Sequence, residues 1–352
     1  MKASDTVFLK ETLKLAEHGR FTCAPNPTVG CLIVRGGRII GRGWHQRAGE
    51  AHAEVAAIND AGGQVRGSTV YVSLEPCAFV GRTPACSATL IEQGVARVVA
   101  ALEDPHAQVA GAGFDMLRRA GIEVAVADMP EARQVIAGYC QRILHNKPLV
   151  RLKTASSVDG AVALADGSSQ WITGAAARAD VQYWRARSDA IVTGAGTVCD
   201  DDPQLNVRDY AAVKQPLRVI LDPQARVPRS AKVLTDGGAT LWLTRAAQQD
   251  LSVGVENLVF ETNNLDKLLN LLADRGCNEV LVEAGPTLIG SFLELGCWDE
   301  WLAYVAPKVM GQDAQSLASL VVNDMASTYN ATLSEVRVLE GDARFTLKNV
   351  SA

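Results

Sequence analysis

The chain shows two patterns of apolar and polar positions, one with the period of helices and one typical of buried strands. Across residues 5–18, apolar side chains recur at roughly helical spacing, and the pattern stops at Gly19, which predicts a first helix. Residues 29–34 form a short apolar run, and the turn after it leads into Ile39 and Ile40. This arrangement predicts a buried strand that continues into a hairpin.

The rest of the first half alternates between the same two patterns. Gly62 and Gly63, for example, end an alanine-rich helical segment and precede a run of strand-forming residues. The predicted helices lie at 52–61, 87–93, 113–120 and 131–144, and the predicted strands lie at 69–73, 95–102 and 122–126. Alternating helices and strands favour a three-layer α/β/α domain.

A polar stretch that contains Pro148 follows the helix predicted at 131–144 and indicates a domain boundary. The 352 residues fit two domains, because single domains commonly contain about 100–200 residues. We therefore predict domains at 1–146 and 147–352, the second also α/β with a mostly open sheet. Its strands are expected near 149–154, 189–194, 217–221, 239–243, 257–260, 279–283 and 301–306, and its helices near 175–187, 265–275 and 286–296.

Composition narrows the classes of function. The net charge of -5 argues against an extended face for phosphate backbones, so we expect no nucleic-acid partner. No long apolar stretch follows the N-terminus, so we expect no signal peptide, no membrane anchor and a cytoplasmic protein. Without an export signal, the eight cysteines are expected to be reduced thiols or metal ligands. Four in apolar settings are expected to pack as small hydrophobic residues, namely Cys31, Cys140, Cys277 and Cys297.

The first half contains the ligand types of a catalytic zinc site. His52, Cys77 and Cys86 offer one imidazole and two thiolates, which would leave a fourth coordination position open. His52 opens a predicted helix, and Cys77 follows a predicted strand. Zinc lowers the pKa of its bound water to about 7, and a carboxylate that is not a ligand can then carry the proton to a departing amine. Glu54 is the candidate for this proton transfer.

Two alternatives stand beside this interpretation. Residues 78–85 separate the cysteines, whereas the general zinc-deaminase pattern has two residues between them, so His52 could cap a helix while the cysteines pack in a core. A structural zinc would need a fourth protein ligand, for which His45 is the nearby candidate. We interpret His45 as a substrate contact instead.

The second half gives weaker signals of its own. Gly194 and Gly196 are followed by Cys199 where a dinucleotide-binding motif has its third glycine, so a standard Rossmann domain is not expected. The strand-to-helix turn at 283–287 is either an ordinary connection or a place where backbone N–H groups receive a phosphate. Arg185 and Arg208 are either a phosphate clamp or solvated surface residues.

Three further side chains in this half need an explanation. Trp171 is equally compatible with core packing and with a ligand site. Lys153 lies on a predicted strand, where lysine is rarely buried without a partner. The acidic run at 200–202 could suggest a metal, but adjacent side chains need not point the same way, and we assign no metal there.

Several short sequence motifs are distributed over nearly the whole chain. In the first half they are Pro-Asn-Pro-Thr-Val-Gly-Cys at 25–31, Gly-Trp-His at 43–45, His-Ala-Glu at 52–54, Leu-Glu-Pro-Cys at 74–77 and Gly-Arg-Thr-Pro at 81–84. In the second half they are Ser-Gln-Trp-Ile-Thr at 169–173, Asp-Asp-Pro at 201–203, Val-Glu-Ala-Gly-Pro at 282–286 and Ala-Pro-Lys at 306–308. Together these runs resemble the bifunctional riboflavin-biosynthesis deaminase/reductase family.

The resemblance implies a fold and two activities. It implies an N-terminal three-layer α/β/α cytidine-deaminase-like domain and a C-terminal dihydrofolate-reductase-like α/β domain. The first would hydrolyse the 2-amino group of a diaminopyrimidinone ribosylamine 5′-phosphate, and the second would reduce the ribosyl chain to ribityl with NADPH. The long gap between the cysteines is a property of this family. Zinc, NADPH, a small pyrimidine ribosylamine phosphate and a homodimer or homotetramer are the implied cofactors and partners.

The resemblance also implies roles for individual residues. In the first domain, Asn26, His45 and Arg82 would hold the pyrimidine nucleotide beside zinc on His52, Cys77 and Cys86, with Glu54 as proton carrier. In the second, Ser169, Arg185, Leu205, Arg208 and Glu283 would contact substrate, and Lys153 and Asp201 would lie nearest the reacting carbon. NADPH would contact Ala155, Trp171, Thr197, Asp201 and a loop formed by Gly285, Pro286, Thr287, Leu288, Ile289, Gly290 and Ser291.

One position departs from the family pattern. The family has a histidine two residues after the first zinc cysteine, and Phe79 stands there in this chain. A reductase whose zinc domain deaminates poorly, or acts on another pyrimidine, is therefore a rival hypothesis. Two others are a deaminase that edits RNA or nucleotides, which the acidic net charge disfavours, and a zinc-stabilised assembly protein without activity, in which Glu54→Gln would change nothing measurable.

Overall fold

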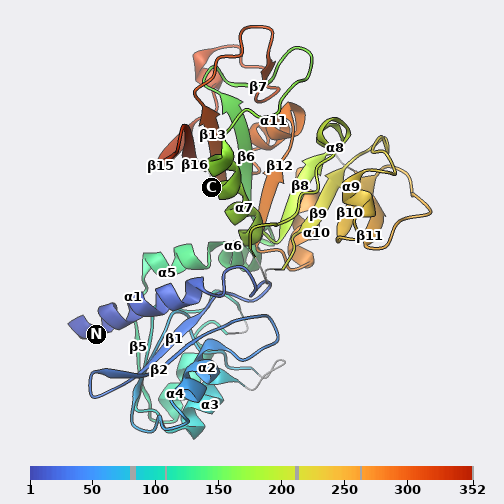
Figure 1. Ribbon diagram of the computed structural model, residues 1–352. Helices are drawn as coiled ribbons and strands as arrows, with labels where there is room; N and C mark the ends of the chain where they lie inside the picture. The colour runs from blue at the N-terminus through green and yellow to red at the C-terminus, as the bar shows by residue number, and fades with distance from the viewer. Residues whose placement is uncertain (80–84, 108, 211–213, 262–263, 351–352) are drawn as a thin grey trace. The chain divides into compact units, whose positions relative to one another are not determined.

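The structure is a computed structural model that describes residues 1–352 except 80–84, 108, 211–213, 262–263 and 351–352. It separates into two compact units, Met1–Asn146 and Lys147–Ala352, which we call the N-terminal and C-terminal units (Figure 1). In the part of the chain that the structure describes, no helix is both long enough and apolar enough to span a bilayer.

The N-terminal unit is built on a five-stranded sheet. Its strand order is β2-β1-β3-β4-β5. The first strand, β1, runs antiparallel to β2 and β3, whereas β3, β4 and β5 are parallel to one another. The strands are β1 (Gly30–Arg35), β2 (Arg38–Trp44), β3 (Thr69–Val72), β4 (Arg97–Ala100) and β5 (Glu123–Val126).

Helices cover both faces of this sheet. Successive strand residues point to opposite faces, so Ile33 packs in the core beneath α2, α3 and α4, while Leu32 packs in a second core with α1, α5 and α6. The three-layer α/β/α prediction is therefore confirmed. The helices are α1 (Ala3–Glu17), α2 (Ala53–Asp60), α3 (Cys86–Glu92), α4 (Ala112–Arg119), α5 (Pro130–Val135) and α6 (Ala137–His145).

The single helix predicted at 131–144 is wrong, because Ile136 interrupts it. Its backbone angles, φ -111° and ψ 24°, are not helical, and they separate α5 from α6. Ile136 and Tyr139 are nevertheless buried in the same core. The apolar pattern thus continues across the break, which is why the sequence did not reveal it.

The C-terminal unit has a nine-stranded sheet in the order β11-β10-β9-β8-β12-β6-β13-β16-β15. The seven strands from β11 to β13 are parallel, and β16 and β15 are added antiparallel. The carboxyl ends of the parallel strands therefore share one edge. The strands are β6 (Leu149–Ser157), β8 (Ala190–Gly194), β9 (Leu217–Leu221), β10 (Thr240–Thr244), β11 (Val255–Val259), β12 (Glu279–Glu283), β13 (Glu300–Ala306), β15 (Ala331–Leu339) and β16 (Asp342–Asn349).

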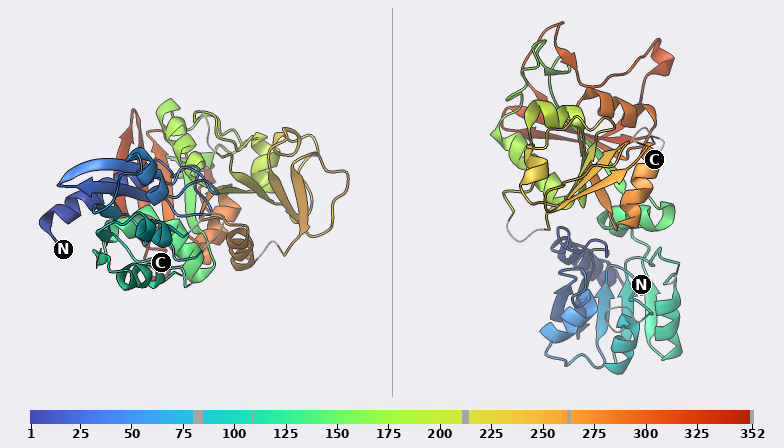
Figure 2. Two further views of the ribbon diagram at one scale, coloured as in Figure 1. Left: turned by 90° about the horizontal axis from the view of Figure 1, so that it is seen from below. Right: turned by 90° about the vertical axis from the view of Figure 1, so that its right-hand side faces the viewer.

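Helices again lie on both faces, as the views in Figures 1 and 2 show. Val280 and Val282 pack with α10 and α11, while Leu281 between them packs with α7 and α8. These elements are α7 (Ala175–Arg187), α8 (Ala195–Asp201), α9 (Lys232–Thr235), α10 (Leu265–Asp274) and α11 (Pro286–Glu294), with a small ladder of β7 (Ala161–Ala163) and β14 (Gln315–Ser316) and a 3₁₀ turn, η1 (Met325–Ser327).

The hairpin of β15 and β16 is absent from the sequence-based prediction. All residues of β15 except Leu339 are exposed, so the strand lacks the buried face that produces a clear alternating pattern. A register shift between Leu333 and Glu335 also displaces the alternation by one residue. An exposed, bulged edge strand gives little signal in a single sequence.

Candidate functional sites

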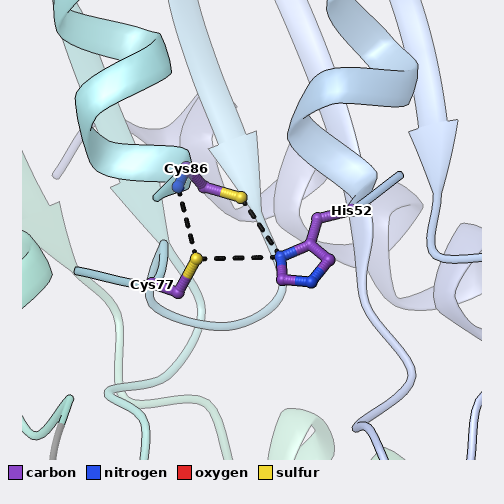
Figure 3. Close-up of side chains that lie close together, drawn as sticks. All are labelled: His52, Cys77 and Cys86. Carbon is purple, nitrogen blue, oxygen red and sulfur yellow. Dashed lines mark hydrogen bonds between the residues drawn. The ribbon is translucent and has the colours of Figure 1, made fainter. Parts of the chain in front are cut away.

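Three predicted zinc ligands converge in the N-terminal unit (Figure 3). His52 is the N-cap of α2, Cys77 lies in the loop after β3, and Cys86 is the first residue of α3. The Nδ1 atom of His52 is 3.7 Å from Sγ of Cys77 and 3.3 Å from Sγ of Cys86. Tetrahedral zinc with ordinary bond lengths would place such nitrogen and sulfur atoms about 3.6 Å apart. The three side chains therefore fit a zinc ion.

The trio offers three protein ligands and leaves a fourth position open. Within the described ranges, these three residues are the group whose ligand atoms all lie within 4.8 Å of one another. His45 is not part of it, because Nδ1 of its ring is 3.0 Å from the carbonyl oxygen of Ala51 and Nε2 is 3.0 Å from the amide nitrogen of Asn26. The geometry thus favours an open catalytic site over a closed structural one.

The local electrostatics favour a thiolate at Cys77. A hydrogen bond from the Cys86 thiol lowers the pKa of Cys77 to about 4, and His52 acts in the same direction. The backbone N–H of Cys86, at the start of α3, also donates to Cys77 Sγ at 3.2 Å. The same contact with Cys77 raises the pKa of Cys86. An N-terminal helix end and a nearby imidazole are the surroundings in which metal-binding thiolates form.

Glu54 lies in the first turn of α2, two residues after His52. Its side chain is buried, with an exposed fraction of 3%. Burial, followed by the neighbouring Cys77, raises the pKa of Glu54 to about 7. A carboxyl group with a pKa close to neutral can both accept and return a proton, which is what a general acid and base requires.

Asn26 and His45 form a fixed pair beside the trio. The ring of His45 is buried and lies 5.2 Å from the ring of His52 in an edge-on arrangement. Because one ring nitrogen faces the carbonyl of Ala51, it carries the hydrogen, and the other accepts from the Asn26 amide. Burial lowers the pKa of His45, so the ring is neutral. Arg82, the third residue in the predicted nucleotide contact, lies outside the described residues.

Phe79 occupies the position at which the resemblance in sequence predicts a histidine. Its side chain is 45% exposed, and its ring centroid lies 6.5 Å from that of His106. The two rings are tilted by 36°. The departure therefore places an accessible apolar ring two residues beyond the ligand Cys77.

A second site lies in the C-terminal unit, where a cavity of about 2000 Å³ follows the carboxyl edge of the parallel strands. Ligands of open α/β sheets bind at this edge. Most predicted site residues of this unit line the cavity, namely Lys153, Ala155, Ser169, Trp171, Arg185, Thr197, Asp201, Leu205, Arg208, Glu283, Gly285, Pro286, Thr287, Leu288 and Ser291.

The segment 285–291, which the resemblance describes as a loop, is helical from Pro286 onward, in agreement with the helix predicted near 286–296. Gly285 is the N-cap of α11, and Pro286 occupies the first helical turn. Two of the seven residues face away from the cavity: Ile289 is fully buried in the core, and a Cβ on Gly290 would lie 2.5 Å from the carbonyl oxygen of Ser319. The cavity meets the helix at its N-terminus, a favourable place for a phosphate.

Arg185 is not the solvated surface residue that was one of its two interpretations, because its side chain is largely buried in an ion pair. Its Nε and Nη2 atoms donate to the Glu283 carboxylate at 2.6 and 2.9 Å, and Nη1 donates to the carbonyl of Asn206 at 3.2 Å. Glu283 is buried, which raises its pKa, but Arg185 outweighs this effect and leaves the pKa below its ordinary value. The two residues therefore form a buried ion pair in the cavity wall. Arg208, in contrast, is exposed along the same wall.

Lys153 lies next to this ion pair. It is paired in register with Glu283 on the adjacent strand, β6 beside β12. Burial, followed by the charge of Arg185, lowers the pKa of Lys153, while Glu283 and Asp201 oppose this shift. The lysine is thus a better proton donor at neutral pH than an exposed one.

Trp171 is not a core residue, because 63% of its surface is exposed. The guanidinium of Arg178 lies 4.7 Å from the centre of its ring, and its carbonyl oxygen accepts a hydrogen bond from Lys308 at 2.6 Å. The ring lines the cavity, where a planar group could stack on it. The core-packing alternative for this tryptophan is therefore wrong.

Besides Arg178, two more arginines that sequence reasoning missed line the cavity. Arg226 follows β9 and Arg245 follows β10, and both are exposed. A single arginine after a strand carries no local signal. Only the parallel order of the strands brings these two charges to the edge that also holds Lys153.

Family models match both units. Residues 148–343 match the model described as RibD C-terminal domain, and residues 2–102 match the model described as cytidine and deoxycytidylate deaminase zinc-binding region. The first of these alone covers more than half of the chain.

Whole proteins match over nearly their full length. The riboflavin biosynthesis protein RibD of Escherichia coli K12 is 43% identical over 335 residues, which is 90% of this chain and 91% of that one. The structure of Acinetobacter baumannii RibD, form 1, superposes with a TM-score of 0.94 at 42% identity, covering 98% of each chain. A second structure superposes with a TM-score of 0.90 at 30% identity, again covering 98% of each chain. It is the diaminohydroxyphosphoribosylaminopyrimidine deaminase/5-amino-6-(5-phosphoribosylamino)uracil reductase of Thermotoga maritima. The chain therefore belongs to the RibD family, the bifunctional deaminase/reductase enzymes of riboflavin biosynthesis.

Proposed function

We propose that the N-terminal unit hydrolyses the 2-amino group of 2,5-diamino-6-ribosylamino-4(3H)-pyrimidinone 5′-phosphate. The observation that carries this proposal is the set of three ligands with a free coordination position beside a buried carboxyl group, Glu54. His52, Cys77 and Cys86 would hold the zinc. When bound, zinc supplies a hydroxide nucleophile at neutral pH.

The residues around the zinc position each have a task in this reaction. Glu54 takes the proton of the nucleophile and delivers it to the leaving amine, for which its pKa of about 7 is suited. Asn26 and the neutral ring of His45 orient the pyrimidine, since their mutual hydrogen bond fixes both side chains. The buried ring of His45 excludes water from this side of the substrate.

Product analysis tests this part of the proposal. We expect zinc-loaded protein to release one ammonia for each pyrimidine converted, before any NADPH is added. Zinc bound in the protein without ammonia release would contradict it, and so would release that is insensitive to removal of zinc.

We propose that the C-terminal unit then reduces the ribosyl chain to ribityl with NADPH, giving 5-amino-6-ribitylaminouracil 5′-phosphate. NADPH supplies the hydride for the anomeric carbon when it is bound. The ring oxygen that leaves this carbon needs a proton, and Lys153 is the suited donor because burial lowers its pKa. Asp201, which accepts a hydrogen bond from Ser169 at 3.5 Å, lines the same part of the cavity.

The strand order supports the binding of a dinucleotide that carries a phosphate in addition to its pyrophosphate. From β6, which holds Lys153, to β10 there are four strand spacings, or about 19 Å. The N-terminus of α11 lies between these ends and suits the pyrophosphate. Arg226 and Arg245 stand at the far end, where arginine would pair with a 2′-phosphate. This arrangement favours NADPH over NADH.

A variant without the lysine amine tests the reductase part. We expect Lys153→Met to oxidise NADPH at least about 100-fold more slowly with the deaminated pyrimidine, because a positioned general acid contributes that much. Ammonia release by the N-terminal unit serves as the internal control. An unchanged rate of NADPH oxidation would remove Lys153 from the mechanism.

We further infer that the chain forms a homodimer or homotetramer. The edge strand β15 supports this, since Leu333, Val336 and Val338 on it are exposed. Exposed apolar edge strands are commonly covered by another chain. Light scattering tests the inference, and a monomeric mass at micromolar concentration would contradict it.

A further inference from the structure

Glu75 is a buried carboxylate that the proposed reaction does not use. Its exposed fraction is 4%, and it lies two residues before the ligand Cys77. One oxygen, Oε2, accepts the backbone N–H groups of Asp104 and Gly111 at 3.2 and 2.9 Å. The other, Oε1, accepts those of Gly113 and Phe114 at 2.9 and 3.3 Å. The carboxylate is therefore fully engaged by backbone groups from other segments.

These contacts connect the ligand loop to the start of α4. Gly111 is the N-cap of this helix, and Gly113 and Phe114 belong to its first turn. The first N–H groups of a helix have no partner within the helix, and a carboxylate satisfies them while stabilising the positive end of the helix dipole. The backbone N–H of Glu75 is also fixed, because it donates to the carbonyl of Leu102 at 2.9 Å.

The next residue along the loop, Pro76, is held from two sides. A Cβ on Gly113 would lie 2.0 Å from the carbonyl oxygen of Pro76, so only glycine allows α4 to approach this closely. From α3, the hydroxyl of Ser87 donates to the same oxygen at 3.0 Å, and the Ser87 N–H donates to the carbonyl of Cys77 at 3.1 Å. The segment from Glu75 to Cys77 is thus fastened to both helices.

We propose that Glu75 is a positioning residue of the metal site, which fastens the loop to α4 so that the Cys77 sulfur stays within coordinating distance of His52 and Cys86. The inference rests on the zinc site of the proposed function. It explains why a charged residue occupies this buried position: a carboxylate accepts four hydrogen bonds here and donates none.

The variant Glu75→Gln keeps the size of the side chain but replaces one acceptor oxygen by an NH₂ group. Whichever way the amide turns, two backbone N–H groups then face a donor. Loss of an outer contact of this kind commonly weakens metal binding 10-fold to 100-fold. We expect a zinc Kd raised by about this factor, with a lower kcat per bound zinc and little change in KM.

The control is the corresponding buried carboxylate of the C-terminal unit. Asp222 is fully buried and accepts the N–H groups of Arg226 and Val227 at 2.9 Å and the indole of Trp242 at 3.1 Å. Asp222→Asn removes comparable contacts far from the cysteines in sequence. It is expected to leave the zinc Kd unchanged.

The experiment is a zinc titration of the metal-free full-length chain against a competing chromophoric chelator. Weaker binding by Glu75→Gln, with normal binding by Asp222→Asn, is the expected result. Equal zinc Kd values for wild type and a folded Glu75→Gln would overturn the positioning role while leaving the zinc site intact. If wild type itself binds no zinc, both the positioning role of Glu75 and the proposed deaminase function are wrong. Should Glu75→Gln not fold, Glu75→Asp keeps the charge but draws the carboxylate back from α4, and an unchanged zinc Kd there overturns the proposal.

Discussion

At the scale of single residues, charge placement separates the two sites. The N-terminal site relies on buried, neutral or near-neutral groups such as Glu54 and His45, whereas the C-terminal cavity is lined by charged side chains of both signs. Arg226 and Arg245 are the cations farthest along the strand order from the ion pair of Arg185 and Glu283.

We predict that Arg245→Gln discriminates between the two nicotinamide cofactors. A hydrogen bond to a charged group contributes about 1.5–3 kcal/mol, so the KM for NADPH should rise about tenfold or more, while the KM for NADH stays nearly unchanged. Steady-state kinetics with both cofactors measure this. Arg229→Gln is the matched control, since Arg229 packs over Trp242 at 4.8 Å and does not line the cavity. An equal rise of the KM for NADPH and for NADH would show that Arg245 does not bind the 2′-phosphate.

The proposed zinc ligands could be named from the sequence because their pattern is local and chemically specific. A His-Ala-Glu run followed by cysteines after a strand names both the ligand types and the proton carrier. The pairing of Arg185 with Glu283 was not predictable, because nearly 100 residues separate the two along the chain. The role of the Glu75 carboxylate was hidden for the same reason, since its partners lie between Asp104 and Phe114.

At the scale of elements, one buried ion pair fastens α1 to the sheet of the N-terminal unit. The Nη1 and Nη2 atoms of Arg97 each donate to the Asp5 carboxylate at 2.9 Å, and the Tyr71 hydroxyl donates to it at 2.9 Å. Asp5 is completely buried. The hydrogen bonds from Arg97 hold the pKa of Asp5 well below its ordinary value.

This pair predicts how stability depends on pH. Because the pKa of Asp5 is lower in the folded than in the unfolded state, its contribution is complete above about pH 4 and is lost as the pH falls below that value. Asp5→Asn should cost about 3–5 kcal/mol of folding free energy at pH 7, since it removes the buried charge partner of Arg97 and leaves it with the largely exposed Glu123, and should flatten the fall in stability at low pH. Chemical unfolding at several pH values measures both. If the free energy of unfolding falls with the same slope at low pH in Asp5→Asn as in wild type, the role given to Asp5 is wrong.

The buried helices and strands could be predicted from the sequence, whereas exposed ones could not. The parallel strands β8, β9 and β12 are short and largely buried, and their predicted positions agree closely with the structure. The exposed strand β15 was missed, and the division between α5 and α6 was hidden because Ile136 is buried like its helical neighbours. Hydrophobic periodicity reports burial, so it cannot reveal exposed strands or breaks within a buried face.

At the scale of the whole molecule, each compact unit contains one of the two candidate sites. The zinc ligands all belong to Met1–Asn146, and the cavity residues all belong to Lys147–Ala352. The two activities should therefore be separable by chemistry that affects only one unit.

Removal of zinc provides this separation. Dialysis against a strong chelator should abolish ammonia release, because the nucleophile is lost, while NADPH oxidation on the deaminated pyrimidine keeps its rate. Activity assays before and after chelation, and again after zinc is restored, measure the effect. A parallel loss of both activities would mean that the metal also sustains the C-terminal unit.

The most direct test of the account concerns Glu54, because the deaminase chemistry depends on a carboxyl group that carries a proton without binding the metal. The measurement is the initial rate of ammonia release from the diaminopyrimidinone ribosylamine 5′-phosphate by wild type and by Glu54→Gln, each with its zinc content determined. We predict full zinc occupancy in both proteins and a rate of ammonia release that is lowered at least about 100-fold in Glu54→Gln. A variant that binds zinc and still releases ammonia at the wild-type rate would contradict it.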